Sequence, residues 1–279
     1  MNLPRFHVRD LNASPIALSE AEARHARRSR RLSAGDRVAL FDGQGRQATG
    51  RILDAAGRRV TVALDHITLI LRPKPALTLA FAIPKGPRQD LLVEKSTELG
   101  VAVLQPINSA RSVADASAHR LEKWHRTAVE AAKQAGLAWL PDIRPILSLE
   151  QLLADAIRYD LTLIALSPAN TSNRTTSVSE GPSPRPLPDI GSRASTATIH
   201  DPAIHPISDL FPTLRAADAV LALVGPEGGW TNGEVARALS ARATPVSLGP
   251  NTLRIETAAV ALAAALHALL TSPSTDASH

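Results

Sequence analysis

VLALVGPEGGWTNGEVARALSARATPVSLGPNTLRIETAAVALAAALHALL, residues 220–270, contains two consecutive corners at which a strand gives way to a rigid loop and then to a helix. The first corner joins the apolar run 220–224 to the loop GPEGG at 225–229. The second leads through the loop GPNTLR at 249–254 into an alanine-rich helix that is predicted to begin near Glu256. Two such corners so close together predict one small-molecule pocket at the carboxyl edge of a parallel sheet.

From Leu77 onward, strands and helices alternate, which is typical of a parallel α/β sheet. Gly100 and Gly136 follow two of the helices, at the position where a left-handed residue commonly ends a helix. The predicted strands are 77–83, 101–107 and 161–166, and the predicted helices are 90–99, 121–134 and 148–157. The chain from 76 to 271 is therefore predicted to form one α/β domain.

The first 72 residues have a different pattern, with short alternating strands separated by Gly/Asp turns. One helix is predicted from Ser19 to Arg31, with Ser19 as its N-cap and Glu22 completing a capping box. The predicted strands are 5–9, 37–41, 48–53 and 59–64. A small β-barrel with one basic helix is expected over 1–72, and Arg72-Pro73-Lys74-Pro75 is expected to be a stiff linker.

Two segments lack residues that could pack into a core. Residues 167–207 are crowded with Ser, Thr and Pro, which predicts a disordered insertion in the α/β domain. A tolerated surface loop is a simpler interpretation of its Ser/Thr-Pro content than a phosphorylation site. Residues 272–279 are expected to form a flexible polar tail.

The composition excludes several classes of function. The chain has 279 residues, 44% of them hydrophobic, and no cysteine. The absence of cysteine excludes disulfides, zinc-thiolate sites and cysteine catalysis. The N-terminus has no apolar leader, and the longest apolar run, 258–266, is far shorter than the roughly 20 residues of a membrane-spanning helix. A cytoplasmic protein without membrane contact is expected.

The basic charge is concentrated in the first quarter of the chain. Residues 1–72 hold 13 Arg, no Lys and 7 Asp or Glu, whereas the rest holds 18 Lys or Arg and 19 Asp or Glu. An arginine-rich unit on a near-neutral body indicates a polyanion partner, and RNA or DNA is the obvious polyanion. The alternative is that these arginines only solvate an ordinary surface.

The two loops do not fit the common nucleotide-binding motifs. The loop at 225–229 lacks the lysine of a Walker A loop and the GxGxxG spacing of a dinucleotide site. No HxxxH or HExxH spacing is present, so no metal site is predicted, and no GxSxG elbow indicates a serine hydrolase. Glu256 has a structural explanation in the first turn of a helix, whereas Glu227 and Arg254 have none.

Several sequence blocks nevertheless resemble one family. LVGPEGGWTNGEV (223–235) and SLGPNTLRIETA (247–258) resemble the C-terminal signature of SPOUT-class RNA methyltransferases, and specifically the RsmE family of 16S rRNA (uracil-N3)-methyltransferases. PKGPRQDLLVEKSTELGV (84–101), NSARSV (108–113) and EAAKQAG (130–136) resemble further blocks of that family in the same order. The N-terminal PRFHV and GDRVALFDGQG occupy the place of its PUA-like barrel.

The resemblance implies a fold and a cofactor that the residues alone do not. It implies a PUA-like β-barrel followed by a SPOUT α/β domain with a deep trefoil knot at its C-terminal end, in a homodimer. It also implies S-adenosylmethionine bound in the knot loops. The matching cofactor-binding positions are Leu166, Gly225, Pro226, Glu227, Gly228, Leu248, Gly249 and Leu253.

The expected reaction is methylation of N3 of a uridine in 16S rRNA, with the free rRNA or the small ribosomal subunit as substrate. Arg254 is expected to stabilise negative charge that develops on the base, and Glu227 and Glu256 are the candidate proton acceptors. The candidate RNA contacts are Arg24, Arg27, Arg28, Arg30, Arg31, Lys85, Arg88 and Arg111.

This sequence departs from the family pattern at a few positions. Ala110 replaces a glutamate and Leu137 an arginine, and we hypothesise that these two losses are coupled through an ion pair or one shared RNA contact. Ser29 and Arg30 replace an apolar pair. The alternatives are a non-catalytic RNA-binding protein of this fold, a methyltransferase for another base and, more remotely, a nucleotide hydrolase.

Overall fold

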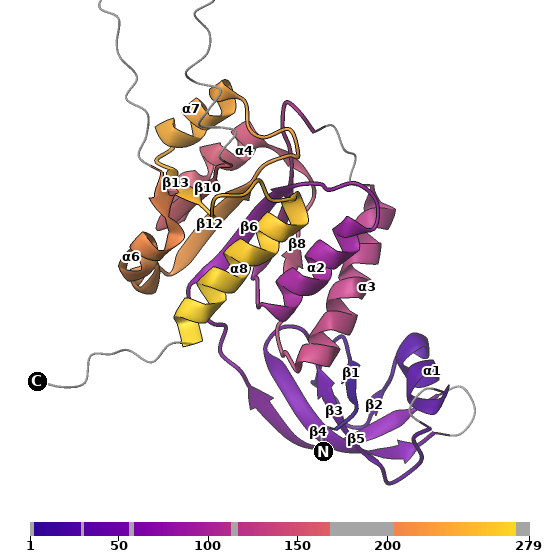
Figure 1. Cartoon of the computed structure of the whole chain (residues 1–279). Coiled ribbons are helices and arrows are strands. Elements are labelled where there is room, and N and C mark those ends of the chain that lie inside the picture. The colour runs from indigo at the N-terminus through magenta and orange to yellow at the C-terminus, as the bar shows by residue number, and fades with distance from the viewer. Residues whose placement is uncertain (1–2, 29–30, 56–58, 113–116, 168–203, 272–279) are drawn as a thin grey trace, which may run out of the picture.

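The computed structural model of the chain describes residues 3–28, 31–55, 59–112, 117–167 and 204–271, and these form two separate β-sheets. Strands β1 to β5 build the N-terminal sheet, and strands β6 to β13 build a larger C-terminal sheet with helices packed against it (Figure 1). In the described part of the chain, no helix is both long and apolar enough to span a membrane.

The N-terminal sheet has the strand order β1-β3-β4-β5-β2 and encloses its own apolar core, which includes Phe6, Leu40, Ile52 and Val62. Its elements are β1 (Arg5–His7), β2 (Ile16–Ala17), α1 (Glu20–Arg28), β3 (Arg37–Phe41), β4 (Arg46–Asp54) and β5 (Thr61–Leu69). Among the described residues the two edge strands β1 and β2 do not pair, so the expected β-barrel takes the form of a half-barrel. The sequence did not predict β2 because two residues carry no readable period.

Helix α1 is shorter than the sequence predicts. It ends at Arg28, and Arg31 has a positive φ of 53°, which no α-helix tolerates; residues 29–30 lie outside the described part. The expected capping box is half formed. The Ser19 hydroxyl accepts a hydrogen bond from the Glu22 backbone N–H at 3.3 Å, but the Glu22 carboxylate bonds to Lys133 instead of returning to the N-cap.

The C-terminal sheet is parallel throughout, with the order β11-β13-β10-β12-β6-β7-β8, and β9 pairs with β7. Its strands are β6 (Ala76–Ala82), β7 (Val103–Asn108), β8 (Asp142–Ile143), β9 (Leu147–Ser148), β10 (Leu161–Ala165), β11 (His205–Pro206), β12 (Ala219–Val224) and β13 (Thr244–Ser247). Its helices are α2 (Arg88–Glu98), α3 (Ala118–Ala135), α4 (Leu149–Ala154), α6 (Phe211–Ala216), α7 (Asn232–Ser240) and α8 (Ile255–Thr271), with short 3-10 helices η1 (Ala156–Arg158) and η2 (Ile207–Leu210). The predicted α/β alternation is confirmed.

Helices cover both faces of this sheet (Figure 1). One core joins the sheet to α2, α3, α6 and α8, and the other joins it to α4 and α7. The chain leaves β13 on one side of β10 and returns as α8, which packs against β6, β12 and α2 on the other side. The C-terminal segment therefore crosses back over the sheet between residues 247 and 255; the knot implied by the resemblance stays a prediction.

Two predictions about this domain need correction. The segment 167–207 is not entirely outside the fold, because His205 and Pro206 form β11 and pair with Val246 and Ser247 of β13. The remainder of the predicted insertion, 168–203, and the predicted tail, 272–279, lie outside the described residues. The helix predicted over 148–157 ends at Ala154. The tighter 3-10 helix η1 follows it and leads to β10.

The two sheets are joined by a close backbone contact as well as by the linker. Gly45 donates its N–H to the Ala138 carbonyl oxygen at 3.1 Å, and Leu140 donates to the Gly43 carbonyl oxygen at 3.0 Å. Gly45 has φ +95°, and a Cβ there would lie 2.4 Å from the Trp139 ring. Only glycine allows the turn between β3 and β4 to approach the indole so closely.

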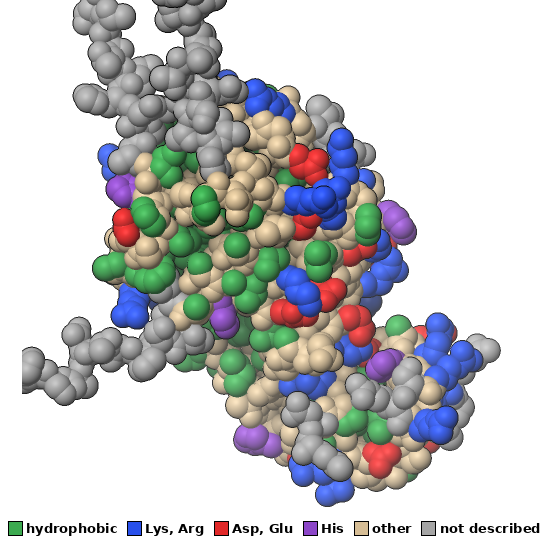
Figure 2. Space-filling view, viewed as in Figure 1, with side chains coloured by type: hydrophobic (Ala, Val, Ile, Leu, Met, Phe, Trp, Pro, Cys, Tyr) green, Lys and Arg blue, Asp and Glu red, His purple; other side chains and the backbone are tan. Residues whose placement is uncertain are grey.

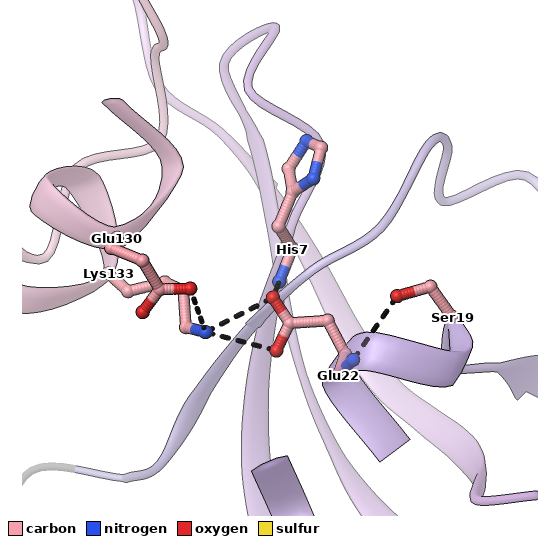
Figure 3. A network of polar contacts seen from close by, with 5 residues as sticks. All are labelled: His7, Ser19, Glu22, Glu130 and Lys133. Atoms are coloured by element: carbon pink, nitrogen blue, oxygen red, sulfur yellow. Dashed lines mark hydrogen bonds and ion pairs between the residues drawn. The ribbon is translucent and has the colours of Figure 1, made fainter. Parts of the chain in front are cut away.

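A polar network crosses the same junction. Lys133 of α3 forms ion pairs with Glu22 of α1 and with Glu130, and Glu22 also accepts a weak hydrogen bond from the His7 backbone N–H (Figure 3). The helix that carries the predicted RNA-binding arginines is thereby fixed to the helix that packs on α2.

Candidate functional site

A cleft that is open to solvent lies at the carboxyl ends of the three neighbouring strands β13, β10 and β12. Each strand supplies the residues that follow it, so the two predicted loops and the end of β10 meet in one site, as the sequence indicated. The predicted cofactor residues that line the cleft are Leu166, Gly225, Pro226, Glu227, Leu248, Gly249 and Leu253. Gly228 is the exception, because Gly229 lines the cleft in its place.

The first loop is shaped by Trp230. Its indole is 3% exposed, lines the cleft and donates from Nε1 to the Ala165 carbonyl oxygen at 3.1 Å. A Cβ at Gly225 would lie 2.7 Å from the indole Cε2, so the indole leaves no room for a side chain there. The helix that follows begins with a complete capping box between Thr231 and Glu234. These contacts make the first loop a preformed wall.

Two arginines from neighbouring loops hold the tip of this loop. Arg88, at the start of α2, donates from Nη1 to Glu227 Oε1 at 2.5 Å. Arg111, in the loop after β7, donates from Nη1 to the Gly228 carbonyl oxygen. Both cations were expected to contact RNA, but in this structure each also fixes the cleft.

The second loop provides the opposite wall and carries Arg254. Gly249 has φ +119°, a conformation that favours glycine, and its N–H donates to the Ser247 hydroxyl at 3.2 Å. Leu253 and Ile255 line the cleft on either side of Arg254 in sequence, and Arg254 itself is exposed. Arg254 is therefore not part of the cleft wall itself.

Glu256 is a buried carboxylate in the first turn of α8. Its side chain is 8% exposed, and Oε1 is 3.9 Å from Arg88 Nε. The other oxygen, Oε2, is buried and has no hydrogen-bond partner among the described residues. Glu256 does not line the cleft, so of the two candidate proton acceptors only Glu227 does.

The remaining predicted RNA contacts lie on the surface. Arg24, Arg28, Arg31, Lys85 and Arg111 are exposed, Arg27 is half-buried, and Arg30 is outside the described residues. Figure 2 shows Lys and Arg side chains gathered over the end of the N-terminal unit where α1 lies. Arg24 is paired with Glu20 at 3.0 Å, which offsets part of this positive charge.

For a single chain, the ion-pair form of the hypothesis that couples Ala110 to Leu137 is wrong, whereas the shared RNA contact stays a prediction. Ala110 follows β7 at the carboxyl edge of the sheet, and its N–H donates to Glu234 Oε1 at 2.8 Å. Leu137 follows α3 at the opposite edge, where its carbonyl oxygen accepts from Arg5 Nη2 at 2.9 Å. The six residues of β7 alone span about 20 Å, too far for an ion pair.

Sequence reasoning missed several residues of the site. Trp230 could have been predicted as a site residue from the sequence, because it directly follows the glycine loop in a chain with only 3 tryptophans. No pattern in the sequence indicated the contact between Arg88 and Glu227, since the two residues are 139 positions apart. The other missed lining residues are Ala165, Ser167, Val224, Gly229, Asn251, Thr252, Ile255 and Ala258. In the described part of the chain, no three His, Cys, Asp or Glu side chains converge as a metal site would require.

The fold and the site together define the class of protein. The parallel α/β sheet, with its preformed cleft at the carboxyl edge, is a small-molecule-binding domain. It is fixed to a small arginine-bearing β unit, which is a polyanion-binding domain. Comparison with known proteins identifies the family of this chain within that class. The chain belongs to the RNA methyltransferases: the model of the RNA methyltransferase domain matches residues 72–185 and 190–267, and that of the RNA methyltransferase PUA domain matches 18–65. The resemblance inferred from the sequence blocks is confirmed, and the match extends into the segment 168–203.

Individual relatives agree with this assignment. Ribosomal RNA small subunit methyltransferase E of Synechocystis sp. is 29% identical over 258 residues, which cover 92% of this chain and 74% of the relative. A crystal structure of ribosomal RNA small subunit methyltransferase E from Neisseria gonorrhoeae, bound to S-adenosyl methionine, superposes with a TM-score of 0.73 at 28% identity, covering 96% of this chain and 98% of that one. A probable rRNA-methyltransferase from Porphyromonas gingivalis gives a TM-score of 0.74 at 28% identity over the same shares.

Proposed function

We propose that this protein transfers a methyl group from S-adenosylmethionine to N3 of a uridine in 16S ribosomal RNA. The observation that carries the proposal is the cleft between the two glycine–proline loops, in a chain that aligns over 96% of its length with a methyltransferase E bound to S-adenosyl methionine. Two of the relatives named above are ribosomal RNA small subunit methyltransferases, and this chain matches both an RNA methyltransferase domain and an RNA methyltransferase PUA domain. We also propose the division into domains at 1–72 and 76–271.

The residues of the cleft fit S-adenosylmethionine. Apolar side chains, among them Leu166, Leu248 and Leu253, suit a flat adenine ring, while the backbone of two glycine loops offers hydrogen bonds at close approach. Glu227 also lines the cleft, with its carboxylate ion-paired to Arg88.

Methyl transfer requires that the protein position the uridine and stabilise the negative charge that develops on the base. It does not require a strong nucleophile from the protein. S-adenosylmethionine, when bound, supplies an electrophilic methyl group on a sulfonium. N3 of uridine is a weak acid, and its loss of a proton leaves negative charge shared by N3 and the carbonyl oxygens O2 and O4. Arg254 is exposed and lies in the sequence between two residues that line the cleft, and we assign its guanidinium to stabilise that charge.

Glu227 is the better placed of the two candidate proton acceptors, because it lines the cleft while Glu256 is buried behind it. A base in reach of the cleft has its N3 edge free only when it is unpaired, so the uridine must be single-stranded or flipped out of its helix. The arginines of α1 would hold the RNA backbone by phosphate contacts, which position the RNA but carry little sequence information.

We further propose that the protein acts as a cytoplasmic homodimer through α8. In the single chain, Val260, Ala261, Ala264 and Ala265 form a stripe on α8 that is only half-buried. Hydrophobic side chains spread over the face on which α8 lies (Figure 2). Burying this face against a second copy would remove apolar surface from water. Sedimentation of the purified protein tests the dimer.

The experiment that tests the function compares Arg254→Ala with the wild type and with Arg215→Ala, a matched loss of an exposed arginine on α6. Arg254→Ala is expected to abolish methyl transfer to rRNA while S-adenosylmethionine affinity, measured by calorimetry, stays within about twofold. Normal turnover in this variant would exclude Arg254 from the mechanism. A wild-type protein that binds RNA but not S-adenosylmethionine would instead support the non-catalytic alternative.

A further inference from the structure

Arg88 occupies a position that its predicted role as an RNA contact does not explain. It is the first residue of α2, in the loop that follows β6, and its side chain is 33% exposed. An arginine reserved for RNA phosphate would extend into solvent. Arg88 instead points at acidic groups of the same chain.

Its two partners belong to the two different loops of the cleft. Arg88 Nη1 lies 2.5 Å from Oε1 of Glu227, which is in the first loop and lines the cleft. Arg88 Nε lies 3.9 Å from Oε1 of Glu256, which directly follows the second loop and begins α8. One planar guanidinium therefore lies in ion-pair range of carboxylates from both loops.

Among the described residues, no other cation can replace Arg88 in its ion pairs with Glu227 and Glu256. Within the described part of the chain, Arg88 is the only cation in ion-pair range of either carboxylate. Glu256 is buried with Oε2 unpartnered, so loss of Arg88 would leave a buried carboxylate without any nearby positive charge. The second loop and the start of α8 would then be free to move away from Glu227.

We propose that Arg88 is a positioning residue that clamps the two cleft loops at the spacing S-adenosylmethionine requires. This inference rests on the proposed function, since the cleft must take that ligand. Lysine is a poor replacement, because a point charge on a flexible stem does not reproduce a planar fork directed at two carboxylates.

The test measures the affinities of S-adenosylmethionine and its product, S-adenosylhomocysteine, by calorimetry in the wild type, Arg88→Ala and Arg88→Lys. Lys95→Ala is the matched control, because Lys95 is also a cation of α2 shared between two carboxylates, Glu94 and Glu98, away from the cleft. Arg88→Ala is expected to weaken both ligands by a similar factor, roughly tenfold, as expected for loss of a charge-assisted contact. Arg88→Lys is expected to recover only part of this loss, and Lys95→Ala to change neither affinity.

Comparing the two ligands separates positioning from simple charge. The sulfonium of the donor is positive and the thioether of the product is neutral, so unmasking Glu227 would by itself tighten the donor and leave the product unchanged. That result, or unchanged affinities with weakened RNA binding, would overturn the clamp. Failure of the wild type to bind either ligand would instead refute the proposed function.

A double-mutant cycle with Glu227→Gln tests the contact itself. If Arg88 acts through Glu227, the effect of Arg88→Ala on both affinities shrinks when Glu227 is already glutamine. Strictly additive effects would show that Arg88 does not act through this carboxylate. The melting temperature of each ligand-free variant shows whether that variant is folded, and an unfolded variant is excluded from the comparison of affinities. A folded variant with weakened binding supports the clamp.

Discussion

The ammonium of Lys133 lies 3.1 Å and 3.0 Å from the two carboxylate oxygens of Glu22, and both side chains are only 9% exposed. Lys133 is on α3 of the RNA methyltransferase domain, whereas Glu22 is on α1, the helix that carries Arg24, Arg27 and Arg28 (Figure 3). A buried pair across a domain junction contributes little net stability but penalises any arrangement that separates its members. The pair therefore fixes the orientation of the basic helix.

Lys133→Met is expected to destabilise the protein by about 3–5 kcal/mol, because it leaves the Glu22 carboxylate buried without a cation. Chemical denaturation measures this change. The double variant Glu22→Gln/Lys133→Met is expected to recover most of the loss. Glu130→Gln, which removes only the exposed partner of Lys133, is the control and is expected to cost less than about 1 kcal/mol. A double variant as unstable as the single one would contradict this account.

His7, at the same junction, predicts a loss of stability on acidification. Burial, followed by repulsion from His125, holds the pKa of His7 below its ordinary value of 6.5. Lys133 lowers this pKa further and Asp42 raises it, but the net shift is downward. Because the unfolded chain takes up the proton first, stability is complete above about pH 6.5 and declines as the pH falls toward the lowered pKa.

The melting temperature at pH 7 and pH 5 measures this effect. His125→Gln removes one cause of the shift and is expected to narrow the difference between the two temperatures. His119→Gln, at the exposed start of the same helix, should leave that difference unchanged. An equal narrowing in both variants would mean that the His7–His125 contact is not responsible.

Gly225→Ala is expected to damage both the fold and the cleft, because the new Cβ would lie 2.7 Å from the buried Trp230 ring. Overpacking of this kind costs about 1–3 kcal/mol, and moving the indole alters a wall of the cleft. S-adenosylmethionine affinity should therefore fall together with the melting temperature. Gly233→Ala in α7, where nothing lies within 4 Å of the added Cβ, should instead leave stability equal or raise it by up to about 1 kcal/mol.

Neutralising the basic face of α1 is expected to weaken RNA binding and flatten its salt dependence. With Arg27 and Arg28 changed to Gln, each lost phosphate contact should reduce the slope of log K against log salt by about 0.7–0.9. Arg30, another candidate RNA contact, lies outside the described residues and is left unchanged. The control replaces Arg158 and Arg215 of the catalytic domain by Gln; equal slopes in the two double variants would indicate that RNA binds elsewhere.

Local features of the fold were readable from the sequence because their causes are local. Gly100 and Gly136 take positive φ values of 73° and 74° after their helices, as expected of helix-ending glycines. The loops at 225–229 and 249–254 stood out through glycine and proline directly after apolar strands, and most of their predicted residues line the cleft. The half-barrel and the strand β11 were not readable, since their edges depend on partners distant in the chain.

The sequence by itself determined the α/β alternation, the two loops and the family, because apolar period, turn residues and motif order are properties of neighbouring positions. Only the tertiary structure brought Arg88 to Glu227 and Lys133 to Glu22, across 139 and 111 positions. It also separated Ala110 from Leu137 and left Gly228 out of the cleft lining. Such contacts arise when packed helices and strands bring remote side chains together, and no local pattern of residue types encodes which cation will meet which carboxylate.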